Sequence, residues 1–366
     1  MRLFCIDIGT GTQDILLLDT TQRVENAIQL VLPAPTILVA NKIKAATMRG
    51  ASVLLIGETM GGGACTQALK KHLEAGLKVY SVPSAALTFS DDLKEVSSWG
   101  IKLLAPDETY NLKVDTIIRM GDVAIDIFRE VLLRWDIQLN PDVIAIAVLD
   151  HGTAPRGESQ RLSRFRHLER LLKKQNNGLK SFIFTPVDLL ECFTRMQAVL
   201  RSIDMEIPKV ILDTGAAAVL GASLDSTVAS HPHRLAVNLG NSHTIAFLLT
   251  GSKVLGLFEH HTERLSMTRL EMFLERLVSG KLRPMEIWED GGHGSLIMGK
   301  GSNPFLVATG PRRSLLASSR LNPYFAAPFG NMMLTGCFGL TKAVSIRFPE
   351  WRDEIERALF TACPNL

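Results

Sequence analysis

Short apolar runs separated by turn residues dominate the first third of the chain. A helical pattern over residues 66–73 lies among them, a longer helix is predicted over residues 116–135, and a strand over residues 143–149 ends in Asp150-His151-Gly152. This alternation of strands and helices is typical of an α/β layer structure. The strand-like runs occupy residues 3–8, 15–19, 27–32, 53–56 and 77–81.

The same pattern begins again near residue 207. Residues 208–213 predict a strand, and the small-residue segment 214–225 predicts a helix. Residues 235–249 then predict a strand, a glycine-containing turn and a second strand, as at the start of the chain. The second half thus opens with the supersecondary unit of the first, which predicts a duplicated architecture.

The composition limits the class of protein. The 366 residues are enough for two domains, and 46% hydrophobic with 21% charged residues is ordinary for a globular protein. A net charge of +3 is too small to indicate nucleic-acid or acidic-membrane binding. No apolar run approaches the roughly 20 residues of a membrane helix, and Asp7 interrupts the only apolar stretch that a signal peptide could use.

The five cysteines are scattered and form no CxxC or other clustered pattern. They therefore predict neither a disulfide framework nor a structural zinc site, and they favour a reduced, cytoplasmic protein. They are Cys5, Cys65, Cys192, Cys337 and Cys363.

The segment DIGTGTQD joins the first two predicted strands. Gly9 and Gly11 bracket Thr10, and Thr12 follows, so consecutive backbone N–H groups and two hydroxyls are free to face an anion. Asp7, at the end of the first strand, is suited to hold Mg²⁺ through water. The segment is either a turn of a hairpin or a phosphate-binding loop.

Five short segments, in order, resemble the marker elements of the superfamily of actin, sugar kinases and heat-shock chaperone ATPases. The last of them contains Gly336 and Gly339, which would permit close helix packing. The five are a first phosphate loop at residues 7–12, a first connecting helix at 211–225, a second phosphate loop at 238–244, an adenosine element at 306–313 and a second connecting helix at 332–344.

The resemblance implies an α/β, duplicated ribonuclease-H-like fold with a nucleotide cleft between two lobes, and ATP and Mg²⁺ as cofactors. The first lobe would comprise residues 1–224 plus 333–366 and the second residues 225–332. The implied nucleotide- and phosphate-binding residues are Asp7, Gly9, Thr10, Gly11, Thr12, Asn238, Gly240, Asn241, Ser242, Thr244, Gly310 and Arg312.

Two positions depart from the superfamily pattern. Asn238 stands where the second phosphate loop usually carries an acid, so it adds no negative charge toward a metal. Gly310 is followed by Pro311 where paired glycines are usual, which leaves adenine specificity less supported than phosphate binding.

Asp213 is the predicted catalytic residue. It follows an apolar strand and precedes an alanine-rich helix, so its carboxylate would lie at the end of the strand, facing the cleft. In hexokinases, which the segment resembles, the matching acid is the base for the substrate hydroxyl. The alternative is a helix N-cap, and both roles are compatible.

The histidines allow several interpretations. Asp150, His151 and His293 are candidates for substrate binding, and Glu259, Asp290 and His293 are candidates for a metal site. The adjacent His260 and His261 would point to opposite faces of a strand, so both cannot easily bind one ion.

Two further segments each leave two interpretations open. The basic segment 156–174 has apolar residues at helical spacing, and its charged face is either solvated or a docking surface for an anion. The glycines at 61–63 precede a helix and provide either an anion site or a flexible entry turn.

A narrower resemblance comes from DIGTGTQD, LDHGTAP, EHHT and EDGGHG, which are similar to a prokaryotic family labelled as related to pyruvate formate-lyase activating enzymes. That label implies radical S-adenosylmethionine chemistry, which requires three closely spaced cysteines for an iron–sulfur cluster. The sequence has no such triplet, so we do not expect this activity.

The first hypothesis is therefore an ATP-dependent phosphotransferase that acts on a small hydroxyl or carboxyl compound. The second is an ATPase that regulates or activates a protein partner. The third is a nucleotide-binding protein without catalysis, which Asn238 makes possible.

Overall fold

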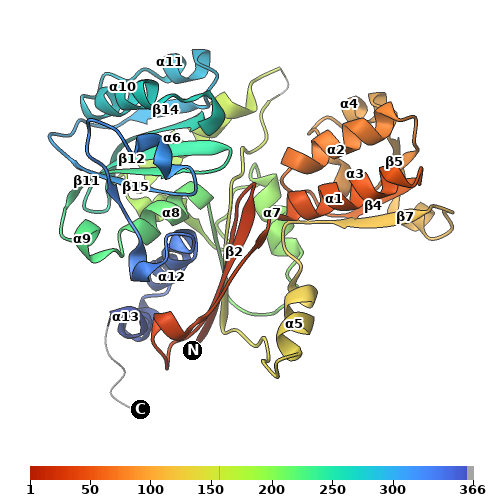
Figure 1. The fold of residues 1–366 in the computed structure, drawn as a ribbon, viewed down its shortest axis with the longest axis horizontal. Coiled ribbons are helices and arrows are strands. Elements are labelled where there is room, and N and C mark those ends of the chain that lie inside the picture. Colours follow the sequence, from red (N-terminus) through yellow and green to blue (C-terminus); the bar gives the residue numbers. More distant parts are fainter. Residues whose placement is uncertain (156, 361–366) are drawn as a thin grey trace.

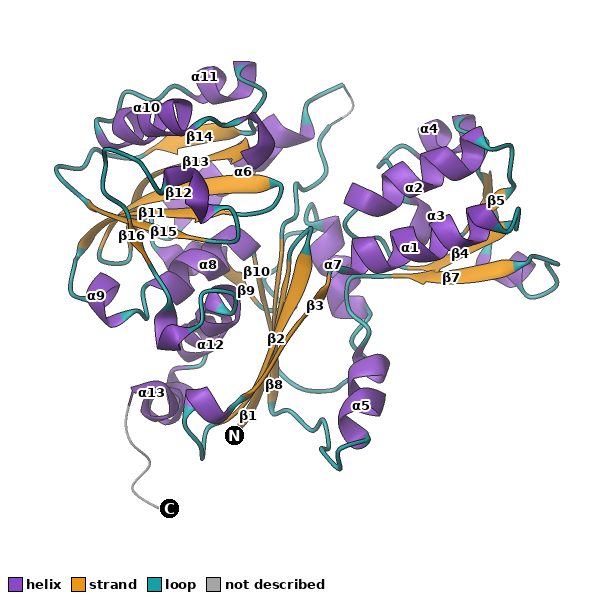
Figure 2. Cartoon of the chain, viewed as in Figure 1, coloured by secondary structure: helices purple, strands orange, loops and turns teal. Residues whose placement is uncertain are grey.

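Three β-sheets organise the computed structural model, which describes residues 1–155 and 157–360 (Figure 1, Figure 2). In the first sheet, three antiparallel strands formed by the N-terminal residues continue into two parallel strands and a short antiparallel edge strand. The order across this sheet is β3 (Ile28–Pro33), β2 (Thr12–Asp19), β1 (Arg2–Ile8), β8 (Val143–Val148), β10 (Lys209–Leu212) and β9 (Ile183–Phe184).

The second sheet repeats this plan. Three consecutive antiparallel strands are again followed by two strands that lie parallel to the first of the three, and a short antiparallel strand lies at the outer edge. The order is β14 (Gly294–Ile297), β13 (Lys253–His261), β12 (His243–Thr250), β11 (His233–Leu239), β15 (Phe305–Thr309) and β16 (Tyr324–Phe325).

In both sheets the strands that share this plan lie in the order third, second, first, fourth, fifth, with the second antiparallel to the first and fourth. This is the ribonuclease-H-like topology, so the duplicated fold predicted from the sequence is confirmed. The predicted strands at residues 3–8, 15–19 and 27–32 correspond to β1, β2 and β3 within a few residues. The limits of the lobes at residues 224 and 332 stay a prediction.

Two helices from the connecting segments lie between the sheets (Figure 1). They are α8 (Thr214–Ala222) and α12 (Thr335–Arg347), and they cross with their backbones in contact. A Cβ atom on Gly221 would overlap the carbonyl oxygen of Thr335, and one on Gly339 would overlap that of Ala217. Gly339 therefore permits the close packing predicted for it, whereas Gly336 faces the side chain of Asp7.

A third, smaller sheet projects to one side of the first lobe, at the right in Figure 1. Its strands are all parallel and are inserted between β3 and β8, with their own apolar core around Ile43, Val53 and Leu69. This inserted domain contains β6 (Lys102–Leu103), β5 (Val79–Ser81), β4 (Val53–Gly57), β7 (Thr116–Met120), α1 (Pro35–Met48), α2 (Gly63–Glu74), α3 (Pro83–Ala86) and α4 (Leu93–Ser98).

The predicted helix over residues 116–135 is wrong in its first part. Residues Thr116–Met120 form β7, which pairs with β4, and only Ile125–Leu133 form a helix, α5. Gly121, with a φ of 152°, separates the two. The β-branched pair Ile117 and Ile118 suits a strand, and pairing with β4 outweighs the apolar spacing that continues into α5.

The remaining helices cover the sheets. α10 and α11 cover the outer face of the second sheet, while α6 belongs to the first lobe but packs against β14 of the second. No helix in the two described ranges is both long and apolar enough to cross a membrane. These helices are α6 (Gln160–Lys174), α7 (Thr194–Arg201), α9 (Ser226–Ala229), α10 (Met267–Val278), α11 (Pro284–Glu289) and α13 (Arg352–Phe360).

The crossing of α8 and α12 predicts that Gly339→Ala destabilises the protein. The new methyl group has no room, because it meets backbone rather than a movable side chain, so the free energy of unfolding should fall by about 1–3 kcal/mol or more. Urea denaturation measures this. Gly178→Ala is the matched control, because Gly178 has a φ of −78° and its Cβ would approach no atom closer than 3.4 Å. Equal stability of the two variants would contradict the backbone contact.

Candidate functional site

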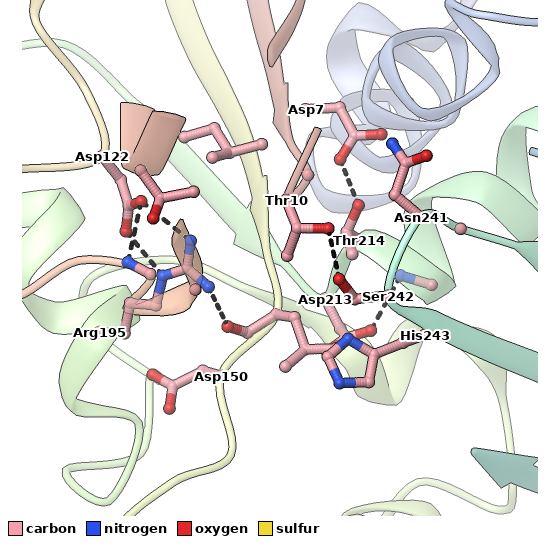
Figure 3. Close-up of a pocket in the computed structure, with 18 of the residues that line it drawn as sticks. Asp7, Thr10, Asp122, Asp150, Arg195, Asp213, Thr214, Asn241, Ser242 and His243 are labelled. Carbon is pink, nitrogen blue, oxygen red and sulfur yellow. Dashed lines mark hydrogen bonds and ion pairs between the residues drawn. The ribbon is translucent and has the colours of Figure 1, made fainter. Parts of the chain in front are cut away.

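A cavity of about 580 Å³ opens where the two lobes and the inserted domain meet. Its lining contains residues of both predicted phosphate loops (Figure 3). It also contains Thr309, Gly310 and Pro311 of the adenosine element and the glycines at 61–63. The predicted residues that line it are Asp7, Gly9, Thr10, Thr12, Asp150, His151, Asp213, Asn238, Gly240, Asn241, Ser242 and Gly310.

The first phosphate loop is a tight turn between β1 and β2. The Gly9 N–H donates to the Thr12 carbonyl oxygen at 2.9 Å, which leaves the Thr10 side chain exposed at the tip. The register of the hairpin sets Asp7 opposite Asp14, and Thr214 at the start of α8 donates a hydrogen bond to Asp7 Oδ1. Gly336 leaves room for Asp7, since a Cβ there would overlap Asp7 Oδ2.

Asp7 and Asp14 form a crowded acidic pair. Burial, the charge of Asp14 and, to a lesser degree, that of Asp213 raise the pKa of Asp7 to about 8. The hydrogen bond from Thr214 lowers this pKa but does not cancel the increase. Burial likewise raises the pKa of Asp14 to about 7. Asp14 Oδ1 is buried and has no hydrogen-bond partner among the described residues. A cation beside these two carboxylates would lower both pKa values, because it would stabilise their ionised forms.

The second phosphate loop joins β11 to β12 and faces the first. The Gly240 N–H donates to the His243 carbonyl oxygen at 2.9 Å, as Gly9 does to Thr12 in the first loop. Ser242 Oγ lies 2.9 Å from Thr10 Oγ1, so the hydroxyls at the two tips are hydrogen-bonded across the cleft (Figure 3).

Three predicted phosphate ligands are not on the cavity lining. Thr244 is fully buried, and its hydroxyl pairs with Thr262 Oγ1 at 2.9 Å, because strand alternation turns it away from the cleft. Gly11 packs against the Asn241 side chain, and Arg312 is exposed beyond Gly310. His243 occupies the lining position that we predicted for Thr244.

Asp213 caps α8 and pairs with Arg164. Its Oδ1 accepts from the Gly215 N–H at 2.9 Å, which confirms the N-cap, and its Oδ2 accepts from Arg164 Nη2 at 2.7 Å. Both carboxylate oxygens therefore have structural partners, and the side chain is buried. The predicted role of Asp213 as a base stays a prediction, and it would require release of Arg164.

Arg164 links the two lobes beneath the cavity. Besides Asp213, it donates from Nε to Glu259 Oε2 at 2.9 Å on β13 and from Nη1 to the Asp150 carbonyl oxygen at 2.6 Å. Its side chain is 1% exposed. The sequence predicts a solvated face or a docking surface for the basic residues of this segment, and Arg164 fits neither. It lies four and seven residues before Leu168 and Leu171, on the same buried face of the helix. That spacing was the signal that Arg164 points inward.

Asp150 is also a structural residue in this state. Its oxygens accept from the backbone N–H groups of Gly152, at 2.8 Å, and Met196, at 2.9 Å, and so fix the loop after β8. Both carboxylate oxygens therefore have backbone partners, and the predicted role of Asp150 in substrate binding stays a prediction. Close by, Arg195 makes two bonds to Asp122, at 2.7 and 2.9 Å, and donates to the Leu149 carbonyl oxygen (Figure 3).

Four histidines gather at the cavity. His151 and His243 line it, and the ring of His293 lies 4.9 Å from each of theirs, centre to centre. The ring of His261 lies 4.9 Å from that of His293. Burial is the main cause that lowers the pKa of His151 well below its usual value and those of His243 and His261 to about 4, so these rings are neutral at pH 7.

The proposed grouping of Glu259, Asp290 and His293 is wrong. Asp290 pairs instead with His260, whose Nε2 lies 3.0 Å from Asp290 Oδ2, and with Arg269. His260 packs against Phe273 on the side of β13 away from the cavity, as expected from the opposite directions of His260 and His261. Glu259 does lie beside His293, with 3.0 Å between Oε1 and Nδ1.

A protein family described as "Putative pyruvate format-lyase activating enzyme (DUF1786)" matches residues 60–315, well over half of the chain. The chain belongs to this family. The match confirms the narrower resemblance and includes the second phosphate loop and the gathered histidines, while the first phosphate loop precedes it. No curated protein matches this DUF1786 chain.

Several solved structures are similar along nearly the whole DUF1786 chain. The activator of 2-hydroxyisocaproyl-CoA dehydratase from Clostridium difficile shares 10% identity over 97% of this chain and 98% of its own, with a TM-score of 0.34. The ethanolamine utilization protein EutJ from Carboxydothermus hydrogenoformans shares 10% over 93% and 89%, with a TM-score of 0.35. The ROK hexokinase from Thermus thermophilus shares 10% over 94% and 98%, with a TM-score of 0.31. TM-scores this low carry no argument about the fold, which is assigned from the strand order of the two sheets.

The network around Arg164 predicts that Arg164→Met strongly destabilises this DUF1786 protein. The change leaves Asp213 and Glu259 buried without their shared cation, and breaking a buried ion pair in this way costs about 3–5 kcal/mol. Urea denaturation at pH 7 measures the loss.

Arg166→Met is the control for this experiment. Arg166 lies two residues along the same helix and pairs with Glu158 at the surface, where both side chains are nearly half exposed. Its loss should change the stability by no more than about 0.5–1 kcal/mol. Similar losses in both variants would contradict the role given to Arg164.

Proposed function

We propose that this protein binds Mg·ATP between its two phosphate loops and transfers the terminal phosphoryl group to a small hydroxyl or carboxyl compound. The observation that carries the proposal is the apposition of the two loops across the cavity, with Thr10 and Ser242 in contact at the tips. Each loop presents backbone N–H groups and a hydroxyl, which are the donors that a polyphosphate requires. Because one loop comes from each lobe, a phosphate chain between them would hold the cleft closed.

The acidic pair on the first hairpin suits Mg²⁺. Asp7 and Asp14 would hold the ion, with Asp14 Oδ1 as the buried oxygen that has no other partner in the described chain. Mg²⁺ prefers carboxylates and water, and usually binds proteins through one or two carboxylates. When bound, the ion neutralises charge on the transferring phosphoryl group. Asn238 leaves the opposite loop without an acid, so the charge that attracts the ion comes from the first lobe.

The acceptor would bind on the side of the cavity formed by the inserted domain. That wall carries the glycines at 61–63 at the start of α2 and the hydroxyls of Thr88 and Ser90, and Arg195 of α7, paired with Asp122, lines the cavity with them. These polar groups suit a small polar compound, and they belong to other elements than the phosphate loops, so the acceptor would have binding groups of its own. This is the feature that favours a phosphotransferase over simple hydrolysis.

An ATPase that acts on a protein partner is the second candidate. It is favoured by a group of apolar side chains exposed on and after α5, on the outside of the first lobe: Ile127, Val131, Leu133 and Trp135. Such exposed groups are typical of protein-binding surfaces. Radical S-adenosylmethionine chemistry is not proposed, because among the described residues no three cysteines lie within metal-binding distance of one another; Cys363 lies outside those residues.

The test of the proposal is ADP release from Mg·ATP, measured with and without pools of small hydroxyl and carboxyl metabolites. Release that depends on one metabolite, with phosphate transferred to it, supports the phosphotransferase. Release without any acceptor favours the ATPase. No release under either condition contradicts both catalytic proposals.

The acidic pair predicts opposite effects of Asp7→Asn on stability and on binding. A pKa raised from 3.8 to about 8 means that ionised Asp7 opposes folding above pH 4, so the neutral amide should give an equal or higher melting temperature without nucleotide. Saturating Mg·ATP, at about 100 times its dissociation constant, should add about 2.7 kcal/mol to the wild type. For a chain of this length that corresponds to roughly 2–4 °C or less, and we expect it to vanish in the variant.

Asp19→Asn is the matched control for Asp7→Asn. Asp19 lies at the other end of the same hairpin, where it accepts hydrogen bonds from Thr21 and Arg2. This variant should keep the full Mg·ATP-dependent shift. An undiminished shift in Asp7→Asn would exclude Asp7 from the magnesium site.

A further inference from the structure

Three imidazole rings converge at the cavity from three separate loops. His151 follows β8 of the first lobe, His243 begins β12, and His293 immediately precedes β14 of the second lobe. One ring nitrogen from each lies within 4.8 Å of the other two. The cluster is separate from the acidic pair on the first hairpin. His243 belongs to the second phosphate loop, but that loop uses its backbone carbonyl oxygen and not its ring.

The spacing of the rings is that of a metal site. A zinc ion binds imidazole nitrogens at about 2.0–2.1 Å in tetrahedral geometry, which sets the ring centres of two ligands roughly 5 Å apart. The centres of His151 and His293 are 4.9 Å apart, those of His243 and His293 4.9 Å, and those of His151 and His243 6.0 Å. His151 and His243 are both partly exposed, and small rotations of either ring would bring all three pairs of ring centres to this spacing.

His293 is the buried member of the cluster and has no hydrogen-bond partner. Its side chain is 1% exposed, and both ring nitrogens lack a partner among the described residues. Nδ1 lies 3.0 Å from Glu259 Oε1, although the two are not aligned for a hydrogen bond. A buried polar ring without partners costs free energy of folding, so a ligand that bound a ring nitrogen of His293 would stabilise the site.

Glu259 completes the arrangement expected around a metal-binding histidine. A carboxylate beside the second ring nitrogen orients such a ligand and increases its basicity. Arg164 holds the other oxygen of Glu259, so the carboxylate is fixed in position. Nε2 of His293 is then the nitrogen left to face His151 and His243.

We propose that His151, His243 and His293 bind one divalent transition-metal ion of the Zn²⁺ class, with its remaining coordination position open to the cavity. Neutral nitrogen ligands select such ions over Mg²⁺, which prefers oxygen. Among the described residues the site has three histidine ligands within mutual reach and no cysteine, which is the pattern of zinc sites that keep a position for water or substrate. Because His151 belongs to one lobe and the other two ligands to the second, the ion would also tie the lobes together.

The test uses the full-length protein, stripped with a chelator, incubated with ZnSO4, desalted and analysed for zinc by mass spectrometry. We expect about one ion per chain. His151→Ala and His243→Ala should each weaken retention by more than the roughly 10–100-fold that loss of an outer partner costs. His233→Ala is the control, because His233 is exposed at the start of β11 and pairs with Thr250. It should retain zinc fully.

Cobalt replaces zinc in a second measurement that requires no variant. Co²⁺ bound to the wild type should give the intense visible bands of four-coordinate cobalt, since coordination geometry is diagnostic of the ligand set. Failure of the folded wild type to retain either ion would overturn the proposal. So would undiminished zinc in folded His151→Ala and His243→Ala, which would show that the ion binds elsewhere. Neither result bears on Mg·ATP binding, which the Asp7 variant tests.

Discussion

The buried guanidinium of Arg164 is the interaction on which the arrangement of the cleft depends. It is the cation between Asp213 at the start of α8 and Glu259 on β13, and it also binds the carbonyl oxygen of Asp150. Burial alone would lower its pKa, but the two carboxylates raise it, so it stays charged. Burial alone would raise the pKa of Glu259, but Arg164 and His293 hold it well below its usual value. One side chain thus fixes the helix that reaches Asp7, the loop that carries His151 and the carboxylate beside His293.

Two kinds of groups face the cavity on this frame, and their chemistry separates them. Oxygen donors lie at the first hairpin, where Asp7 and Asp14 are opposed in the register of β1 and β2. Nitrogen donors lie where His151, His243 and His293 meet. Mg²⁺ prefers oxygen ligands and ions of the zinc class prefer imidazole nitrogens, so the two proposals assign these ions to different positions in the cleft. The first position lies on the hairpin of the first phosphate loop, and the second includes the ring of His243 from the second loop.

The sequence predicted the features that depend on short-range pattern. The strand–turn–strand units, α8 and its N-cap at Asp213, and the close approach at Gly339 follow from periodicity, capping and glycine spacing. The inserted domain escaped prediction as a unit, because its core forms between residues far apart in the chain, and β7 was assigned to a helix for the same reason. Arg164, Asp14 and His243 were missed as site residues because their roles arise from pairing across elements. Two of these could have been found from the sequence. Arg164 has the helical spacing of the buried leucines of its helix, and Asp14 follows the glycines of the first loop as Asp7 precedes them.

The central claim is that a phosphate chain lies between the two loops, and a disulfide across them tests it most directly. The hydrogen bond between Thr10 and Ser242 makes these two positions suitable for a Thr10→Cys, Ser242→Cys double variant. Loss of free thiols under mild oxidation measures bond formation, and each single-cysteine variant is a control for the native thiols. The account predicts that the bond forms readily in the free protein and is slowed strongly by Mg·ATP. Formation at the same rate with saturating Mg·ATP would contradict it.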